Sequence, residues 1–314
     1  LTFGIYLLTT GGFSLGLLVR YLAYVNNLYG PLRQLAGLRG NMQTALAGWD
    51  RISAILQMHN EMVILPEQMG AQKIDAPVMQ FNEVSFAYVE DKKVLHDVNF
   101  TLEQGKTYAL VGPTGGGKTT TASLMARLYD PTAGTVYLNG ADIRSVSIEE
   151  RTKQIGFILQ EPILFSGTVR ENILYGNKEL QEYSNEKLST VIADTGLERL
   201  LARFEGGLDA KVSTSGDALS LGQKQLIAFM RAVLRKPSLL ILDEATANID
   251  TVTEDMLEDI LEKLPATTTR VIIAHRLNTI ENADVIFFIN AGKITEAGSM
   301  EHAVEMLQHG DKLS

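Results

Sequence analysis

Eight consecutive residues constrain this chain more than any other stretch: Gly112-Pro113-Thr114-Gly115-Gly116-Gly117-Lys118-Thr119. They match the pattern G-x-x-x-x-G-K-[ST], in which glycine-rich backbone turns its N–H groups inward around a phosphate chain. The apolar run 108–111 before them is typical of a buried strand. Residues 120–129 after them are compatible with a helix, whose N-terminus favours anions. The pattern predicts that Lys118 reaches the β- and γ-phosphates and that the Thr119 hydroxyl binds Mg²⁺. The alternative is a glycine-rich turn with a surface lysine.

Length and charge narrow the class of protein. The chain has 314 residues, which suggests about two domains. It contains no cysteine, which excludes disulfides and thiolate metal sites. Its formal net charge of -9 argues against a protein that mainly binds nucleic acid. It begins at Leu1 without a charged leader or a small-residue cleavage site, so we expect the C-terminal part of a longer protein rather than a secreted chain.

The N-terminal residues are apolar in two runs, 1–9 and 13–28, separated by a pair of glycines. Neither run reaches the roughly 20 residues of an uninterrupted membrane span. We interpret them as the end of one membrane helix, a tight turn and the start of the next helix. Arginines follow the second run closely, at positions 33, 39 and 51, and this places that end in the cytoplasm. The alternative is a buried hairpin of a soluble domain.

The second helix is predicted to continue far beyond the apolar run. Apolar residues recur at spacings of three and four, and Gly30-Pro31 is expected to kink the helix without ending it. A helix over 13–58 is about 70 Å long and extends well beyond a hydrocarbon core of about 30 Å. Arg20 either faces a translocation path or extends to the interface, and we favour the second. The repeating residues are Leu35, Leu38, Met42, Leu46, Trp49, Ile52 and Leu56.

From residue 78 onward the pattern changes to short apolar runs between turns and amphipathic segments. An antiparallel lead-in followed by alternating strands and helices predicts a mostly parallel sheet with helices on both sides. The polar stretch 59–77 before it, with Pro66, Gly70 and Pro77, is interpreted as a linker. Strands are expected over 78–88, 94–102, 107–111, 135–138, 155–159, 239–242, 270–274 and 285–289, and helices over 185–204, 223–234, 252–264 and 300–308.

Three of these strands end in residues suited to nucleotide hydrolysis. The run 239–242 ends in Asp243-Glu244, and ligands of open α/β sheets lie at the carboxyl ends of strands. Asp243 is expected to hold Mg²⁺, and Glu244 to orient the attacking water. His275 follows another strand and is a candidate for the γ-phosphate, whereas Gln160 follows a third and is a candidate for Mg²⁺ or the water. In isolation, the two acids are explained as well by a helix cap, and the histidine by a structural role.

The order of these motifs resembles the nucleotide-binding domain of ATP-binding cassette (ABC) proteins over residues 78 to about 308. The segment 219–223 reads Leu-Ser-Leu-Gly-Gln, similar to the signature motif of the family, and Asp250 ends a segment similar to its D-loop. Residues 167–173 and 1–56 resemble parts of ABC exporters. The resemblance implies an α/β P-loop NTPase with a mixed-sheet core, an antiparallel β subdomain and an α-helical subdomain, preceded by an all-α transmembrane segment. The implied domains are 1–58 (membrane), 59–77 (linker) and 78–314 (nucleotide-binding).

The resemblance also implies the cofactors, ATP and Mg²⁺, and a role for each matching residue. Tyr88 is expected to stack on adenine, although a tyrosine packed on the core is the alternative. The signature residues complete the ATP site of an opposing domain, and Gln160 with the segment after it contacts the transmembrane domain. The implied nucleotide-binding residues are Tyr88, Gly112 to Thr119, Thr120, Ser220, Gly222, Gln223 and Asp250; the catalytic ones are Glu244, His275 and Gln160; the metal-binding ones are Thr119, Gln160 and Asp243.

The signature motif departs from the family pattern. Leu221 replaces the first glycine, Leu226 stands where arginine is usual, and residues 214–218 lack the common Glu-Arg-Gly sequence. Gly116, where serine is frequent, is a milder departure. An altered signature beside intact P-loop and strand-end residues resembles one subunit of a heterodimeric exporter with unequal sites. The partner then supplies a good signature.

These features together predict the ATPase half of an exporter, a multi-pass protein of the cell membrane with its ATP-binding domain in the cytoplasm. Its partners are the lipid bilayer, a second half-transporter and an export substrate that these residues do not identify, and not nucleic acid. The alternatives are a homodimeric drug or lipid exporter, a soluble ABC ATPase acting on DNA or translation, and a regulatory partner in which hydrolysis is incidental.

Overall fold

The computed structural model describes residues 2–10, 14–57, 62–66, 76–213, 219–243, 251–273, 282–298 and 302. The chain divides into two units, residues 1–61 and residues 62–314. The helix expected over 300–308 lies outside the described residues, apart from position 302.

The first unit contains two helices, α1 (Thr2–Thr9) and α2 (Leu15–Leu56). The side chain of Ser14 caps α2 by accepting a hydrogen bond from the backbone N–H of Leu17 at 3.2 Å. The helix then runs for 42 residues with Pro31 inside it, which confirms the prediction of one long helix past Gly30-Pro31. A proline is accommodated here because it removes a single N–H from a long hydrogen-bonded ladder.

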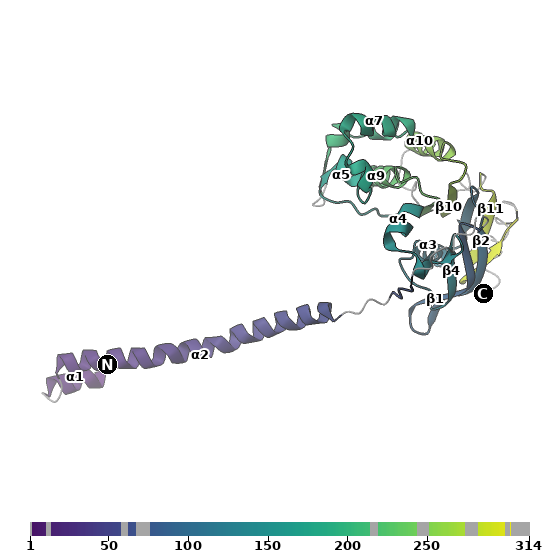
Figure 1. Cartoon of the computed structure of the whole chain (residues 1–314). Coiled ribbons are helices and arrows are strands. Elements are labelled where there is room, and N and C mark those ends of the chain that lie inside the picture. The colour runs from purple at the N-terminus through teal and green to yellow at the C-terminus, as the bar shows by residue number, and fades with distance from the viewer. Residues whose placement is uncertain are drawn as a thin grey trace. The chain divides into compact units, whose positions relative to one another are not determined.

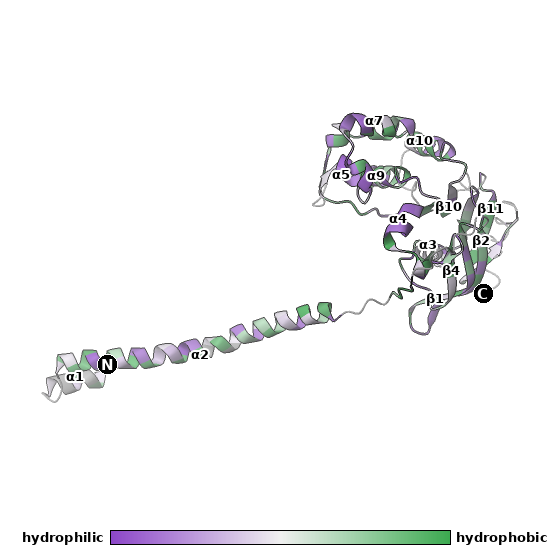
Figure 2. Cartoon of the chain, viewed as in Figure 1, coloured by the Kyte–Doolittle hydropathy of each residue, from purple (hydrophilic) through white to green (hydrophobic). Residues whose placement is uncertain are grey.

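We expected this unit to contain membrane-spanning helices, and the structure does not show them among the residues it describes. Within the described ranges, no helix is both long enough and apolar enough to cross a membrane. The reason is visible in the sequence of α2, where Arg20, the Asn26-Asn27 pair and Arg33 interrupt the apolar residues. Figure 2 shows this alternation of hydrophobic and hydrophilic residues along the helix.

The second unit contains the strands and the remaining helices (Figure 1). The strands are β1 (Met79–Val89), β2 (Lys92–Leu102), β3 (Thr107–Val111), β4 (Ala133–Leu138), β5 (Ala141–Asp142), β6 (Ile155–Ile158), β7 (Gly167–Thr168), β8 (Lys211–Val212), β9 (Leu239–Asp243), β10 (Thr269–Ile273), β11 (Val285–Asn290) and β12 (Lys293–Glu296). The helices are α3 (Lys118–Met125), α4 (Ile148–Gln154), α5 (Val169–Ile173), α6 (Lys178–Gln181), α7 (Asn185–Asp194), α8 (Glu198–Leu201), α9 (Leu221–Val233) and α10 (Thr251–Glu262), with 3-10 turns η1 (Ile143–Ser145) and η2 (Gly207–Asp209).

The central sheet of this unit is mixed. Its strand order is β12-β11-β3-β10-β9-β6, and every neighbouring pair is parallel except β11 and β12. A second, antiparallel sheet has the order β2-β1-β4-β5, and β7 pairs with β8. The predicted α/β fold, with an antiparallel lead-in before a mostly parallel sheet, is confirmed.

The two faces of the central sheet pack against different partners. Successive side chains of a strand point to opposite faces, and β9 is buried throughout. Leu239 and Ile241 belong to the apolar cluster that includes β1, β2 and α3, whereas Leu240 and Leu242 belong to the cluster formed with α5, α7 and α9. Figure 1 shows α5, α7, α9 and α10 gathered at one end of the unit, away from β1, β2 and β4. This burial explains why the strands are continuous apolar runs.

Two helix predictions needed correction. The helix expected over 185–204 is divided into α7 and α8, because Gly196 adopts a left-handed φ of 71° between them. The helix expected over 223–234 begins two residues earlier, at Leu221, because Ser220 caps it. The second difference concerns the signature segment directly.

Candidate functional site

The loop between β3 and α3, residues 112–117, forms the centre of the site. It ends at Gly117, which precedes α3 with a left-handed φ of 114°. The loop passes close to β11: a Cβ atom on Gly116 would lie 2.7 Å from the carbonyl oxygen of Ile289, and the N–H of Gly292 donates to the Gly116 carbonyl at 3.1 Å. Only glycine fits this approach without a shift of the backbone. This close approach is a steric reason for glycine at position 116, where serine is frequent in the family that the sequence resembles.

Lys118 is the first residue of α3 and is only 6% exposed. Its ammonium group donates to the backbone carbonyls of Gly112 at 2.9 Å and Pro113 at 3.0 Å. The side chain is therefore folded back across its own loop. A positive charge held over a glycine-rich loop, at the N-terminus of a helix, is an arrangement that attracts phosphate.

Thr119 and Asp243 meet across the sheet, although 124 positions separate them in sequence. The Thr119 hydroxyl donates to the Asp243 carboxylate at 3.4 Å, and Asp243 is 4% exposed. The register explains the contact, because Ile273 of β10 pairs with Leu110 of β3 on one side and with Asp243 of β9 on the other. The carboxyl ends of β3 and β9 therefore lie at the same edge.

The oxygen atoms of Thr119 and Asp243 suit a magnesium ion. Mg²⁺ prefers hard oxygen ligands and is commonly bound by one or two carboxylates together with substrate phosphates. In the part of the chain that the structure describes, no group of three or more His, Cys, Asp or Glu side chains forms a metal site.

Gln160 lies at the same edge of the sheet as Asp243. It follows β6, whose Ile158 pairs with Leu242 of β9. Gln160 is exposed, and its backbone carbonyl accepts a hydrogen bond from the buried side chain of Gln225 in α9 at 3.2 Å. This bond links the end of β6 to the helix that begins at the signature segment. Glu244, Asp250 and His275 lie outside the described residues, and their roles stay predictions.

Tyr88, near the end of β1, lies beside the helix that follows the loop. Its hydroxyl donates to the hydroxyl of Thr120 at 3.2 Å, and its ring makes an edge contact with Tyr129 at 5.1 Å between centroids. The residue remains 50% exposed, while its ring also makes an edge contact with the buried Phe86 at 4.8 Å between centroids. Aromatic surface next to a phosphate-binding loop is suited to stacking on a base.

The signature residues form a helix cap. Ser220 accepts a hydrogen bond on its hydroxyl from the N–H of Gln223 at 3.1 Å, and Gln223 accepts one on its side-chain oxygen from the N–H of Ser220 at 3.0 Å. This reciprocal capping box begins α9, and Gly222 is the second residue of the helix. Leu221 is 36% exposed at the helix start, whereas Leu226 is 3% exposed in the apolar cluster. Only Leu221 therefore changes the surface of the motif.

The segment after Gln160 is held by Asn172 and Arg231, to which the sequence analysis assigned no role of their own. The buried amide of Asn172 donates to the carbonyl of Phe165 at 2.8 Å and accepts from its N–H at 2.9 Å. Arg231 of α9 donates to the backbone carbonyl of Asn172 at 2.8 Å and to that of Ile163 at 3.1 Å. Burial lowers the pKa of Arg231. The spacing of Thr168 and Glu171, which form a capping box, is the signal that marks this segment in the sequence.

Comparison with known proteins identifies a family model and several relatives that this chain resembles. Residues 95–247 match the family model described as ABC transporter. The chain is 38% identical over 296 residues to the uncharacterized ABC transporter ATP-binding protein YfiC of Bacillus subtilis, covering 94% of this chain and 48% of the relative. It is 36% identical to a multidrug resistance ABC transporter ATP-binding and permease protein of Lactococcus lactis, covering 97% of this chain and 51% of the relative.

A solved structure is similar over the same length. The structure of a bacterial Atm1-family ABC exporter with ATP bound superposes with a TM-score of 0.71 and 29% identity, covering 94% of this chain and 51% of that one. The chain therefore spans about half the length of the proteins it matches. Its predicted resemblance to exporter proteins is confirmed at the level of the ATP-binding region.

Proposed function

We propose that this chain is an ATP-binding protein of the ABC transporter family and that it hydrolyses ATP as one half of an exporter. The observation that carries the proposal is the meeting of Thr119 with Asp243 beside a loop that Lys118 crosses. These groups are the positioning and charge-stabilising parts of a phosphoryl-transfer site. The reaction transfers the γ-phosphoryl group of ATP to water and yields ADP and phosphate.

The proposed roles follow from the positions of the groups. Lys118 exchanges the two loop carbonyls for phosphate oxygens, since an ammonium–phosphate contact is a charge-assisted hydrogen bond. Thr119 and Asp243, with Gln160 at the same edge, would hold Mg²⁺, which neutralises the charge of the phosphates when bound. Tyr88 stacks on adenine. Glu244 orients the attacking water and His275 contacts the γ-phosphate, roles that rest on the family resemblance.

We further propose that the site is completed by a second ABC half-transporter. Ser220, Gly222 and Gln223 lie at the start of α9 and would face the γ-phosphate of the nucleotide bound by the partner. The exposed side chain of Leu221 would alter that approach, because the usual glycine has no side chain. This favours a heterodimer over a homodimer, in which the partner supplies the better signature.

The proposal that the protein exports a substrate is based on the names of similar proteins. Two of the proteins reported above are named as a multidrug resistance ABC transporter and an ABC exporter, and this chain matches about half of each. We propose that the whole protein is a multi-pass component of the cell membrane, with its ATP-binding unit in the cytoplasm. The surface at residues 163–175, where Ile163, Phe165 and Tyr175 are 67%, 42% and 50% exposed, is the proposed contact for the transmembrane part.

The substitution Glu244→Gln tests hydrolysis. We expect steady-state ATPase activity of the membrane-expressed protein to fall by about a hundredfold or more, with nucleotide binding retained, because an amide polarises water less well than a carboxylate. The matched control is Glu205→Gln at an exposed position. Unchanged hydrolysis in Glu244→Gln would exclude Glu244 as the general base.

Co-expression tests the partner. The chain would be expressed alone and together with the ABC protein of the neighbouring open reading frame, and ATPase activity measured in membranes. We expect high activity only for the pair. Full activity of the chain alone would establish a homodimer instead. Recovery of the intact protein in the soluble fraction without detergent would favour a soluble ABC ATPase.

A further inference from the structure

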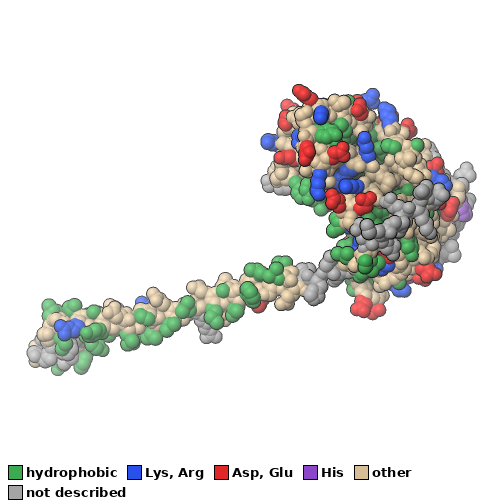
Figure 3. Space-filling model, in the orientation of Figure 1, with side chains coloured by type: hydrophobic (Ala, Val, Ile, Leu, Met, Phe, Trp, Pro, Cys, Tyr) green, Lys and Arg blue, Asp and Glu red, His purple; other side chains and the backbone are tan. Residues whose placement is uncertain are grey.

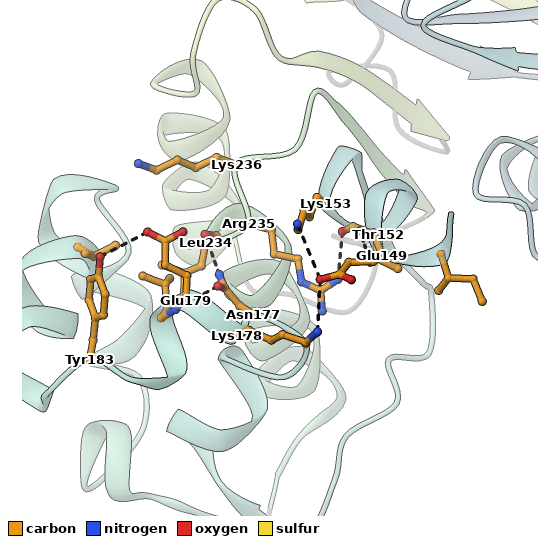
Figure 4. A pocket seen from close by; sticks show the side chains of 14 residues that line it. Glu149, Thr152, Lys153, Asn177, Lys178, Glu179, Tyr183, Leu234, Arg235 and Lys236 are labelled. Carbon is orange, nitrogen blue, oxygen red and sulfur yellow. Dashed lines mark hydrogen bonds and ion pairs between the residues drawn. The ribbon is translucent and has the colours of Figure 1, made fainter. Parts of the chain in front are cut away.

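A cavity of about 860 Å³ lies apart from the nucleotide-binding loop, between α4, the segment around α6 and the C-terminal end of α9. Its volume is within the range of small-molecule sites. Figure 4 shows side chains from these separate elements around it. The lining residues are Ile148, Glu149, Thr152, Lys153, Gly176, Asn177, Lys178, Glu179, Leu180, Tyr183, Val191, Leu234, Arg235 and Lys236.

Basic side chains outnumber acidic ones in this lining, and only some of the basic ones form ion pairs within the described part of the chain. Four are basic and two are acidic. Glu149 already pairs with Lys178 at 3.3 Å and with Lys153 at 3.9 Å, and Glu179 accepts a hydrogen bond from the Tyr183 hydroxyl at 3.5 Å. Arg235 and Lys236 have no carboxylate within ion-pair distance among the residues that the structure describes. The cavity therefore carries an excess of positive charge.

Arg235 is held in place by its neighbours but only partly satisfied. Its guanidinium donates to the backbone carbonyls of Tyr175 and Thr152. Its Nε atom is buried and has no hydrogen-bond partner. Burial lowers the pKa of Arg235, and this reflects the cost of keeping the charge away from water. Gly176 makes the arrangement possible, because a Cβ there would lie 2.5 Å from an Arg235 nitrogen.

We propose that this cavity binds a small organic phosphate. The fixed guanidinium of Arg235 would donate to the phosphate oxygens, since its planar fork matches that geometry, and Lys178 and Lys236 would add charge. The organic part would pack on the apolar lining, which includes Ile148, Leu180 and Leu234. A phosphate is favoured over a monocarboxylate because its charge of nearly -2 balances the excess of two basic side chains.

Two structural elements connect this cavity to the ATP site. α4 leads directly into β6 and Gln160, and α9 begins at the capped signature residue Ser220. Arg235 bonds to a carbonyl of α4 from the end of α9. A ligand on Arg235 would therefore contact both elements that lead to nucleotide-binding residues.

Phenyl phosphate is the probe for this site. It would be titrated calorimetrically into the full chain saturated with ADP and Mg²⁺, so that the loop at 112–119 is filled, with phenol as the uncharged control. We expect saturable binding of phenyl phosphate and none of phenol. Arg235→Gln should weaken binding at least about tenfold, the effect of losing a charge-assisted contact. Arg199→Gln, in an exposed ion pair with Asp259 outside the cavity, should bind like wild type.

Arg235 also forms hydrogen bonds to the backbone, so Arg235→Gln alone does not separate loss of the ligand contact from loss of the fold. A second variant makes this distinction. The side chain of Lys178 is 85% exposed, so Lys178→Glu removes no buried side chain; it reverses one charge of the lining and removes the exposed ion pair with Glu149. We expect weaker binding in this variant with an unchanged circular dichroism spectrum. Absence of binding to the wild type, undiminished binding in both variants, or binding that occurs only without ADP would each overturn the proposal.

Discussion

At the scale of single residues, Asp243 joins the last position of a buried strand to the phosphate loop. Its carboxylate accepts a hydrogen bond from Thr119 at 3.4 Å while the residue is 4% exposed. We expect Asp243→Asn to lower Mg²⁺-dependent ATP hydrolysis by about a hundredfold, because the amide keeps the shape but not the charge that holds a cation.

The measurement is ATPase rate against Mg²⁺ concentration, with Asp209→Asn, an exposed acid of η2, as the control. A variant with the wild-type rate at every Mg²⁺ concentration would contradict the assignment of Asp243.

Asp142 makes stability depend on pH. Burial alone raises the pKa of its carboxyl, but hydrogen bonds from Arg144 and the charge of that guanidinium outweigh burial and lower the pKa below its ordinary value of 3.8. The stabilisation is therefore complete above about pH 3.8 and is lost as the pH falls through the lower pKa of the folded state. Asp142→Asn should cost about 1–2 kcal/mol at pH 7.

Urea unfolding at several pH values checks this prediction. The difference in unfolding free energy between Asp142→Asn and wild type should shrink below about pH 3.8. A difference that stays constant from pH 7 into the acid range would show that the charge of Asp142 contributes nothing.

At the scale of elements, α5 and α9 are joined through Asn172. The amide of Asn172 satisfies both backbone groups of Phe165, and Arg231 of α9 bonds to the carbonyl of Asn172. We expect Asn172→Ala to lower the free energy of unfolding by about 2–3 kcal/mol, because the buried amide is lost and both backbone groups of Phe165 lose this hydrogen-bond partner. The change would be measured by chemical denaturation.

Asn185→Ala is the matched control for this prediction. Asn185 is exposed and accepts one hydrogen bond from Arg170 at 3.0 Å, so its loss should cost well under about 1 kcal/mol. Equal losses in the two variants would mean that burial of Asn172 does not matter.

At the scale of the whole molecule, nucleotide binding should stabilise residues 62–314 as a unit. ATP with Mg²⁺ at about 100 times its Kd should add about 2.7 kcal/mol to the free energy of unfolding. Lys118→Ala should remove most of this gain, because it loses the ammonium that crosses the loop. Thermal unfolding with and without nucleotide measures both effects, and Lys211→Ala at an exposed site is the control.

The long helix α2 also concerns the whole molecule. The apolar side chains that recur along it remain exposed, with Leu35 at 61% and Trp49 at 64% (Figure 3). Isolated exposed hydrophobic residues are common, but a stripe of this length is typical of a surface that another partner covers. This agrees with the proposal that the chain works as half of a larger assembly.

The sequence alone determined the phosphate-binding loop, the alternation of strands and helices and the set of candidate strand-end residues. These features are local, since they depend on glycine conformation and on the spacing of apolar residues along neighbouring turns and strands. The long helix through Pro31 was predictable for the same reason. The apolar runs at the N-terminus were predicted to cross a membrane, whereas α2 is too polar for this in the described structure.

Only the tertiary structure decided which of these residues meet. Thr119 contacts Asp243 because β10 lies between β3 and β9, and strand order is not encoded in either local pattern. Likewise, the sequence gives no reason to separate Leu221 from Leu226, yet one is at the surface and the other in the core. The cavity around Arg235 arises from segments nearly 90 residues apart. Such contacts depend on packing over long sequence separations, which no short window of sequence contains.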